Sequence, residues 1–158
     1  MIRALPTTQP GSRAARHDAR WPAIAAALAD LRERGRFAVR IVEADCGAGS
    51  LLLHAVQHAR RLGFTAIEGR GIDRSPALIV RARAAAKALR DPAIGVIFDS
   101  ADVTDALRDE HDLPADLIIW NGRWHGDVAA ALSRAGDRVI PSPCTAPPRS
   151  KRGETGLS

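Results

Sequence analysis

Cysteine is scarce in this chain and long apolar runs are absent, and each absence removes a class of protein. Cys46 and Cys144 are the two cysteines and lie far apart, so neither a disulfide framework nor a four-ligand zinc site is supported. The expected location is therefore a reducing cytoplasm. No apolar run approaches the roughly 18–20 residues that a membrane-spanning helix needs, which argues against a membrane protein.

Lysine and aromatic residues are also scarce, and this bears on the net charge of +5. Arginine carries nearly all of the positive charge, because Lys87 and Lys151 are the only lysines. A basic chain invites a nucleic-acid partner. However, the arginines are scattered over expected helix faces without aromatic platforms, and a GC-rich coding sequence produces the same bias. Charge alone therefore leaves a nucleic-acid partner open without establishing it.

The length of 158 residues indicates one domain. Residues 1–17 are rich in arginine, serine and threonine, which predicts a flexible leader of bacterial type rather than a mitochondrial transit peptide. Residues 18–140 form the expected domain. Residues 141–158 are rich in proline and arginine and are predicted to be a disordered tail.

Apolar periodicity within the domain predicts helices that alternate with short strands. Helices are expected at 18–35, 50–62, 75–90, 103–110 and 127–134, and strands at 37–44, 64–72, 94–98, 116–120 and 138–140. This order predicts an α/β fold, a three-layer Rossmann-like sandwich whose mostly parallel sheet of about five strands has helices on both faces. Ligands of such folds bind at the carboxyl ends of the strands, where the strand order reverses beside the first strand.

Chemistry-bearing residues gather at those expected strand ends. Glu43 ends the first strand, and Gly47 and Gly49 follow in a loop that leads directly into a helix. Glycines let the backbone approach a ligand closely, and a carboxylate accepts hydrogen bonds from it. Asp73 follows the second strand, where the two hydroxyls of a ribose are bound in such folds. The sequence therefore predicts a site for a nucleotide-like ligand.

These segments resemble motifs of the class I S-adenosylmethionine-dependent methyltransferases. Residues 42–49, Val-Glu-Ala-Asp-Cys-Gly-Ala-Gly, are similar to the first motif, an acidic residue followed by a glycine-rich loop. Residues 71–79, Gly-Ile-Asp-Arg-Ser-Pro-Ala-Leu-Ile, are similar to the second motif, an acidic residue before a Ser-Pro helix start. Residues 99–103 and 116–121 resemble the third and fourth motifs, and the likeness covers about 37–140.

The resemblance implies a methyltransferase that uses S-adenosyl-L-methionine and passes its methyl group, by direct displacement, to an acceptor whose identity stays open. It implies that Asp73 binds the ribose and that Asp102 with Ala101 reaches the adenine. The glycines of the first loop would pack against the cofactor. The cofactor-binding residues that it implies are Glu43, Asp45, Gly47, Gly49, Asp73, Arg74, Ala101, Asp102 and Asn121.

The segment after the fourth strand supplies candidates for the methyl-transfer side. Asn121 and its neighbours would lie near the methionine part of the cofactor. Trp124 and His125 are candidates to line a substrate pocket, with His125 as a general base, although a structural Trp–His pair in a loop is the competing interpretation.

Three other residues receive structural interpretations. His54 and His58 have the i, i+4 spacing of metal ligands, but no third ligand is evident, and we expect both on the solvated face of a helix. No metal site is therefore predicted. Cys46 is expected to be a small packing residue rather than a nucleophile.

Asp45 and the segment after the fifth strand depart from the family pattern. Asp45 stands where the family usually has its first loop glycine, so its side chain either crowds the loop or pairs with the ammonium or sulfonium of the cofactor. Family members usually continue into a further strand pair, whereas a proline-rich segment follows residue 140 here.

These departures keep other functions open. One alternative is a non-catalytic S-adenosylmethionine-binding, regulatory or partner-binding module. A separate possibility is that a homo-oligomer or a partner protein completes the substrate side. NAD suits the glycine loop less well, because Leu52 stands in place of the third glycine of the dinucleotide fingerprint.

Overall fold

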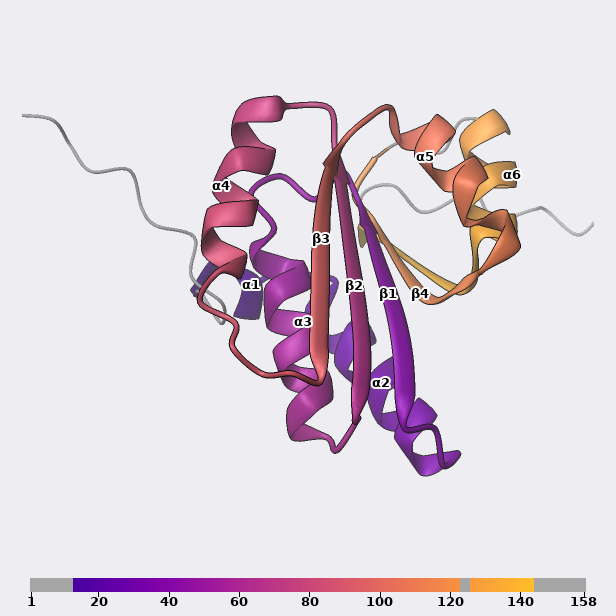
Figure 1. Ribbon diagram of the computed structural model, residues 1–158. Coiled ribbons are helices and arrows are strands. Elements are labelled where there is room, and N and C mark those ends of the chain that lie inside the picture. The colour runs from indigo at the N-terminus through magenta and orange to yellow at the C-terminus, as the bar shows by residue number, and fades with distance from the viewer. Residues whose placement is uncertain (1–12, 123–125, 144–158) are drawn as a thin grey trace, which may run out of the picture.

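A computed structural model describes residues 13–122 and 126–143 as one parallel β-sheet with helices on both faces (Figure 1). The strands are β1 (Ala38–Ala44), β2 (Ala66–Asp73), β3 (Ile94–Ser100), β4 (Ala115–Trp120) and β5 (Gly136–Pro141). Their order in the sheet is β3-β2-β1-β4-β5, and each neighbouring pair is parallel. The predicted three-layer α/β fold is confirmed.

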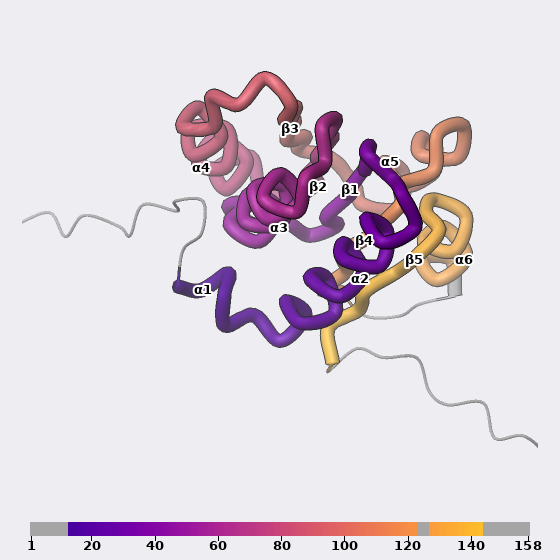
Figure 2. Tube along the Cα trace, turned by 90° about the horizontal axis from the view of Figure 1, so that it is seen from below, coloured from indigo at the N-terminus to yellow at the C-terminus, as the bar shows by residue number. Residues whose placement is uncertain are grey.

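The helices divide into two layers according to the face of the sheet that they cover (Figure 2). One layer holds α1 (Arg13–Arg16), α2 (Trp21–Glu33), α3 (Ser50–Arg61) and α4 (Pro76–Ala86). The other holds α5 (Val103–Asp109), the short 3-10 helix η1 (Glu110–Asp112) and α6 (Gly126–Ala135). The predicted helices are present, but α4 ends at Ala86 rather than near residue 90.

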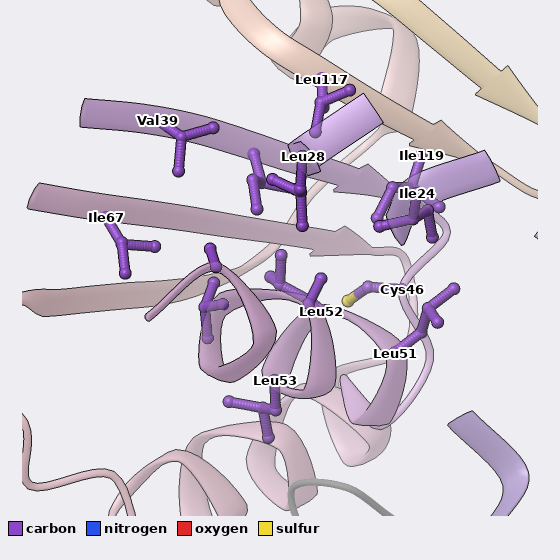
Figure 3. Packing of buried hydrophobic residues seen from close by; sticks show 14 of the residues in the cluster. Ile24, Leu28, Val39, Cys46, Leu51, Leu52, Leu53, Ile67, Leu117 and Ile119 are labelled. Carbon is purple, nitrogen blue, oxygen red and sulfur yellow. The ribbon is translucent and has the colours of Figure 1, made fainter. Parts of the chain in front are cut away.

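Alternating strand residues build a separate core on each face of the sheet. In β1, Val39 and Ile41 point into the core that α2 and α3 close, where Leu28 and Leu52 meet the sheet (Figure 3). Val42 belongs to the second core, which α5 and α6 close. Both faces of β1 are therefore buried, which explains why this strand reads as a nearly continuous apolar run.

The strand order reverses at β1, which lies between β2 and β4. Ala44 is in register with Ile72 of β2 and with Trp120 of β4. The loops after these three strands therefore leave the sheet at the same level, at the top of Figure 1. This edge of the sheet, where α/β proteins bind ligands, is called the carboxyl edge below.

Two expectations from the sequence need correction. Residues 1–17 were expected as a leader, but α1 lies within them and Ala15 is buried against the first core, so packing begins before residue 18. The interpretation of His54 as solvated is wrong, because Trp21 of α2 covers its ring at a centroid distance of 4.2 Å. Helical periodicity alone does not reveal that a second helix packs on this side of α3. No helix in the described ranges is long and apolar enough to cross a membrane.

Candidate cofactor site

The loop between β1 and α3 turns sharply through three residues with positive φ. Asp45, Gly47 and Gly49 have φ angles of 57°, 58° and 78°. Glycine adopts this left-handed conformation freely, and aspartate tolerates it better than most residues do. The Gly49 N–H donates to the Cys46 carbonyl at 3.0 Å, which closes the turn before the helix starts. The expected strand–glycine loop–helix unit is therefore present.

The two loop glycines meet different surroundings. A Cβ atom at Gly49 would lie 2.6 Å from the ring of Phe98 on β3, so only glycine fits without moving that ring. A Cβ atom at Gly47 would meet nothing within 4 Å. Gly49 thus lets the loop pack on the protein, whereas Gly47 borders open space from which a ligand can approach.

Asp73, at the end of β2, fastens the glycine loop to the sheet. Its Oδ2 accepts the Gly47 N–H at 2.8 Å, and its Oδ1 accepts the Ser75 N–H at 2.8 Å. The hydroxyl of Ser75 in turn caps α4. Each carboxylate oxygen keeps further lone pairs, so Asp73 can also accept hydrogen bonds from a bound ligand.

The loop after β3 joins the same edge through Asp102, Ala101 and Arg74. The Ala101 N–H donates to the Asp73 carbonyl at 3.1 Å. Asp102 caps α5 by accepting the N–H groups of Thr104 and Asp105, and Arg74 pairs with its other oxygen at 2.5 Å. These backbone donors, together with Arg74, lower the pKa of Asp102. The structure therefore brings the predicted adenine-side residues next to Asp73.

Asp45, in the loop after β1, lies beside the loop that follows β4. A Cβ atom at Gly122 would lie 2.9 Å from Asp45 Oδ2, so the two loops touch there, next to the exposed Asn121. Within the described residues, no hydrogen bond or ion pair engages the Asp45 carboxylate. Burial raises its pKa, the charges of Asp73 and Asp102 raise it further, and Arg74 opposes them.

Glu43 lies beneath the glycine loop. Its side chain is 2% exposed, and Oε2 accepts the Leu52 N–H in the first turn of α3 at 3.1 Å. Burial raises the pKa of Glu43 to about 8, against the opposing charge of Arg20, whose Nη2 lies 3.7 Å from Oε1. The structure thus gives Glu43 the task of supporting the loop.

Arg20 belongs to this edge, although the sequence did not single it out. It is 6% exposed, and its Nε and Nη2 both donate to the Asp18 carboxylate at 2.9 Å. Within residues 13–122 and 126–143, its buried Nη1 has no hydrogen-bond partner, and an unsatisfied buried donor of this kind is costly. The only sequence feature that could have indicated the role of Arg20 is its spacing of two residues from Asp18, just before the helix that precedes β1. Many other arginines in the chain made this feature hard to recognise.

Of the remaining candidate residues, one lies in the core and two lie outside the described residues. Cys46 is buried in the first core, as expected for a packing residue, and burial raises the pKa of its thiol. His125 and Trp124 lie outside the described residues. Within the ranges described, no group of three or more histidine, cysteine or acidic residues could hold a metal ion.

Solved structures that superpose on this chain are methyltransferases. The bifunctional kinase-methyltransferase WbdD superposes with a TM-score of 0.59 at 23% identity, over 80% of this chain and 29% of WbdD. An S-adenosylmethionine-dependent methyltransferase from Agrobacterium tumefaciens superposes with a TM-score of 0.53 at 12% identity, over 75% of this chain and 41% of that enzyme. The chain has a methyltransferase fold.

The resemblance read from the motifs is thus confirmed at the level of the fold. The chain spans less than a third of the length of WbdD, so the methyltransferase fold corresponds to one part of that larger protein. No protein-family model matches the sequence, and no curated protein matches it either.

Proposed function

We propose that the carboxyl edge binds S-adenosyl-L-methionine and that the protein transfers the activated methyl group to an acceptor. The observation that carries this proposal is the hydrogen bond from the Gly47 N–H to Asp73, because a carboxylate at the end of β2, where such folds bind ribose, then lies directly beside an open glycine loop. The methyltransferase fold supports the same conclusion.

The charges at this edge favour a cationic ligand over a dinucleotide. Asp45, Asp73 and Asp102 are close enough for the latter two to raise the pKa of Asp45. Such a cluster attracts the sulfonium and ammonium of S-adenosylmethionine and repels the pyrophosphate of NAD. Arg20 Nη1, which has no partner in the described part of the chain, is assigned to the carboxylate of the methionine part, a charged acceptor that would satisfy this donor.

The chain's own residues are proposed to bind and align rather than to transfer protons. When bound, the cofactor would supply the methyl group: the acceptor's nucleophile would bond to the methyl carbon as the carbon–sulfur bond breaks, with S-adenosylhomocysteine as the leaving group. Alignment accounts for much of the rate of such a step. Glu43 supports the loop, Asp73 holds the ribose, and Asp102 with Ala101 and Arg74 forms the adenine side. Asn121 would lie near the methionine part, and His125 stays a candidate base.

Isothermal titration calorimetry tests the proposed cofactor. We expect wild-type protein to bind both S-adenosylmethionine and S-adenosylhomocysteine. Asp73→Ala should weaken both by at least about tenfold, because two charge-assisted hydrogen bonds to the ribose are lost. Asp105→Ala is the control, since this exposed carboxylate on α5 pairs only with Arg108 among the described residues and should bind like wild type.

Two results would contradict the assignment of the cofactor: no binding by wild type, or equal binding by wild type and a folded Asp73→Ala. Thermal unfolding shows whether the variant is folded. This control is needed because Asp73 also anchors the glycine loop.

The alternative function is a non-catalytic module that binds the cofactor without transferring its methyl group. Asp45, in place of the usual loop glycine, favours this alternative. Incubation of cell extract with protein and methyl-labelled cofactor separates the two functions, because label transfer above a no-protein control removes the alternative. Light scattering tests the related proposal of a homo-oligomer that completes the substrate side, which a monomer would contradict.

A further inference from the structure

The Asp45 carboxylate is half-buried and accepts no hydrogen bond or ion pair from the residues that the structure describes. We propose that Asp45 recognises the positive charge at the amino-acid end of the cofactor, a role that a glycine at this position could not perform. This inference rests on the proposed function, because it names the part of the cofactor that the residue reads.

The backbone accommodates Asp45 without help from glycine. Its φ of 57° lies in the left-handed region, which aspartate tolerates better than most residues with a Cβ atom do. Asp45 nonetheless completes the same turn that joins Ala44 to Cys46, and Cys46 still donates to the Ile72 carbonyl at 3.0 Å. Simple crowding predicts that the side chain would keep the loop from closing. The intact turn shows that it does not.

The two neighbouring acids already accept hydrogen bonds from the protein, whereas Asp45 accepts none within the described part of the chain. Asp73 uses one oxygen on Gly47 and the other on Ser75, while Asp102 caps α5 and pairs with Arg74. Asp73 and Asp102 repel the Asp45 charge, and the Arg74 that opposes them is committed to Asp102. A cationic group of the ligand would relieve this repulsion and find an acceptor without a competing partner.

Two buried hydrogen-bond donors near the β1–β4 switch point provide a second, independent indication that a ligand binds beside Asp45. Gly122 leaves room for the ring of Trp120 and for Asp45 Oδ2, which a Cβ atom there would approach to 2.3 Å and 2.9 Å. Trp120 is 4% exposed, and its buried Nε1 has no hydrogen-bond partner among the residues described. Arg20 Nη1, beside Glu43, is a second buried donor in the same state. An anion and a cationic donor, neither of them paired within the described residues, lie at one edge and match the opposite charges of an α-amino acid.

Two substitutions at this position separate charge from shape. Asp45→Asn keeps the size and the tolerance of positive φ but removes the charge. Asp45→Gly restores the residue that the family usually has and removes the side chain altogether. Thermal unfolding of both variants shows whether the loop and the fold persist, and neither substitution should lower the midpoint by more than a few degrees.

Three probes differ in the charges that Asp45 would read. S-adenosylmethionine carries a sulfonium and an ammonium, S-adenosylhomocysteine carries the ammonium alone, and 5′-methylthioadenosine carries neither. We expect Asp45→Asn and Asp45→Gly to weaken S-adenosylmethionine by about tenfold in calorimetry, the size of a partly screened ion pair with its hydrogen bond. Methylthioadenosine should bind both variants and wild type equally.

The arm with S-adenosylhomocysteine identifies the charge that is read. A loss equal to that of S-adenosylmethionine assigns Asp45 to the ammonium, and no loss assigns it to the sulfonium; both results support the proposal. Asp45→Gly binding S-adenosylmethionine as tightly as wild type, or more tightly, overturns it in favour of crowding. Equal losses for all three probes overturn it as well.

The failure of this inference differs from failure of the proposed function. If wild type binds none of the three probes, the cofactor assignment itself is wrong. If wild type binds S-adenosylmethionine and Asp45→Asn binds it equally well, the cofactor assignment stands and the role of Asp45 is refuted.

Discussion

At the scale of single residues, Gly35 and Gly49 share one backbone conformation but differ in how tightly the protein packs around them. Their φ angles are 80° and 78°. Gly35 ends the turn after α2, and a Cβ atom there would meet nothing within 4 Å. At Gly49 the same atom would meet the Phe98 ring at 2.6 Å. The first glycine is required by the backbone alone, and the second by the backbone and the packing of the cofactor loop.

This pair gives a matched test. Gly35→Ala should cost about 1–2 kcal/mol of unfolding free energy, the strain of a positive φ. Gly49→Ala should cost about 2–3 kcal/mol more, because Phe98 must move as well. Urea unfolding of both variants measures the difference, and equal losses would show that the Phe98 contact is not tight.

At the scale of elements, one buried acid holds η1 against the strands. Glu110 is 2% exposed and pairs with Arg40 of β1 at 2.7 Å and with Arg70 of β2 at 2.5 Å. Arg70 belongs to the polar segment that interrupts the apolar pattern of β2, and Arg40 lies beside this segment on β1. Since η1 directly follows α5, this network also fixes the helix that Asp102 caps.

Glu110→Ala should therefore lower the unfolding free energy by about 2–3 kcal/mol, because it removes the shared partner of two partly buried arginines. The control is Glu68→Ala, which removes an exposed partner of the same Arg40 and should cost less than about 1 kcal/mol. Similar losses for the two variants, measured by urea unfolding, would contradict a special role for the buried pair.

At the scale of the whole molecule, Glu43 links global stability to pH. Its pKa is about 8 in the folded protein, against an ordinary value of 4.5, because folding buries the carboxyl group. The folded state therefore binds this proton more tightly than the unfolded state does. The resulting stabilisation is complete below about pH 4.5 and is lost as the pH rises towards 8.

Replacement of Glu43 by glutamine should remove this dependence, since the amide oxygen still accepts the Leu52 N–H but does not ionise. The difference in unfolding free energy between Glu43→Gln and wild type should shift in favour of the variant by more than about 1 kcal/mol between pH 5 and pH 9. Urea unfolding at a series of pH values measures it. Parallel curves for the two proteins would mean that Glu43 is ionised throughout, held by Arg20.

The sequence predicted the elements well because their signals are local. Apolar periodicity and the glycine loop placed every strand within a few residues, and the order of elements then required a parallel sheet. The positions of Asp45, Asp73 and Asp102 at strand ends followed from the same reasoning. Their mutual proximity at one edge is confirmed, although their ligand stays a proposal.

The roles of Arg20, His54 and Gly49 could not be read in the same way. Each depends on a residue distant in sequence: Arg20 on Glu43, His54 on Trp21, and Gly49 on Phe98. No periodicity in the chain records such a pairing, because it arises only when separate helices and strands pack together.

The sequence by itself therefore determined the fold class, the switch point at β1 and the acids that surround it. These follow from hydrophobic patterning and from the handedness of parallel connections, which act within one element or between successive ones. The tertiary structure alone decided which of these acids are occupied. Asp73 and Asp102 are committed to backbone N–H groups and Glu43 is buried, whereas Asp45 is left without a protein partner among the described residues, because hydrogen bonds across the loops are set by packing.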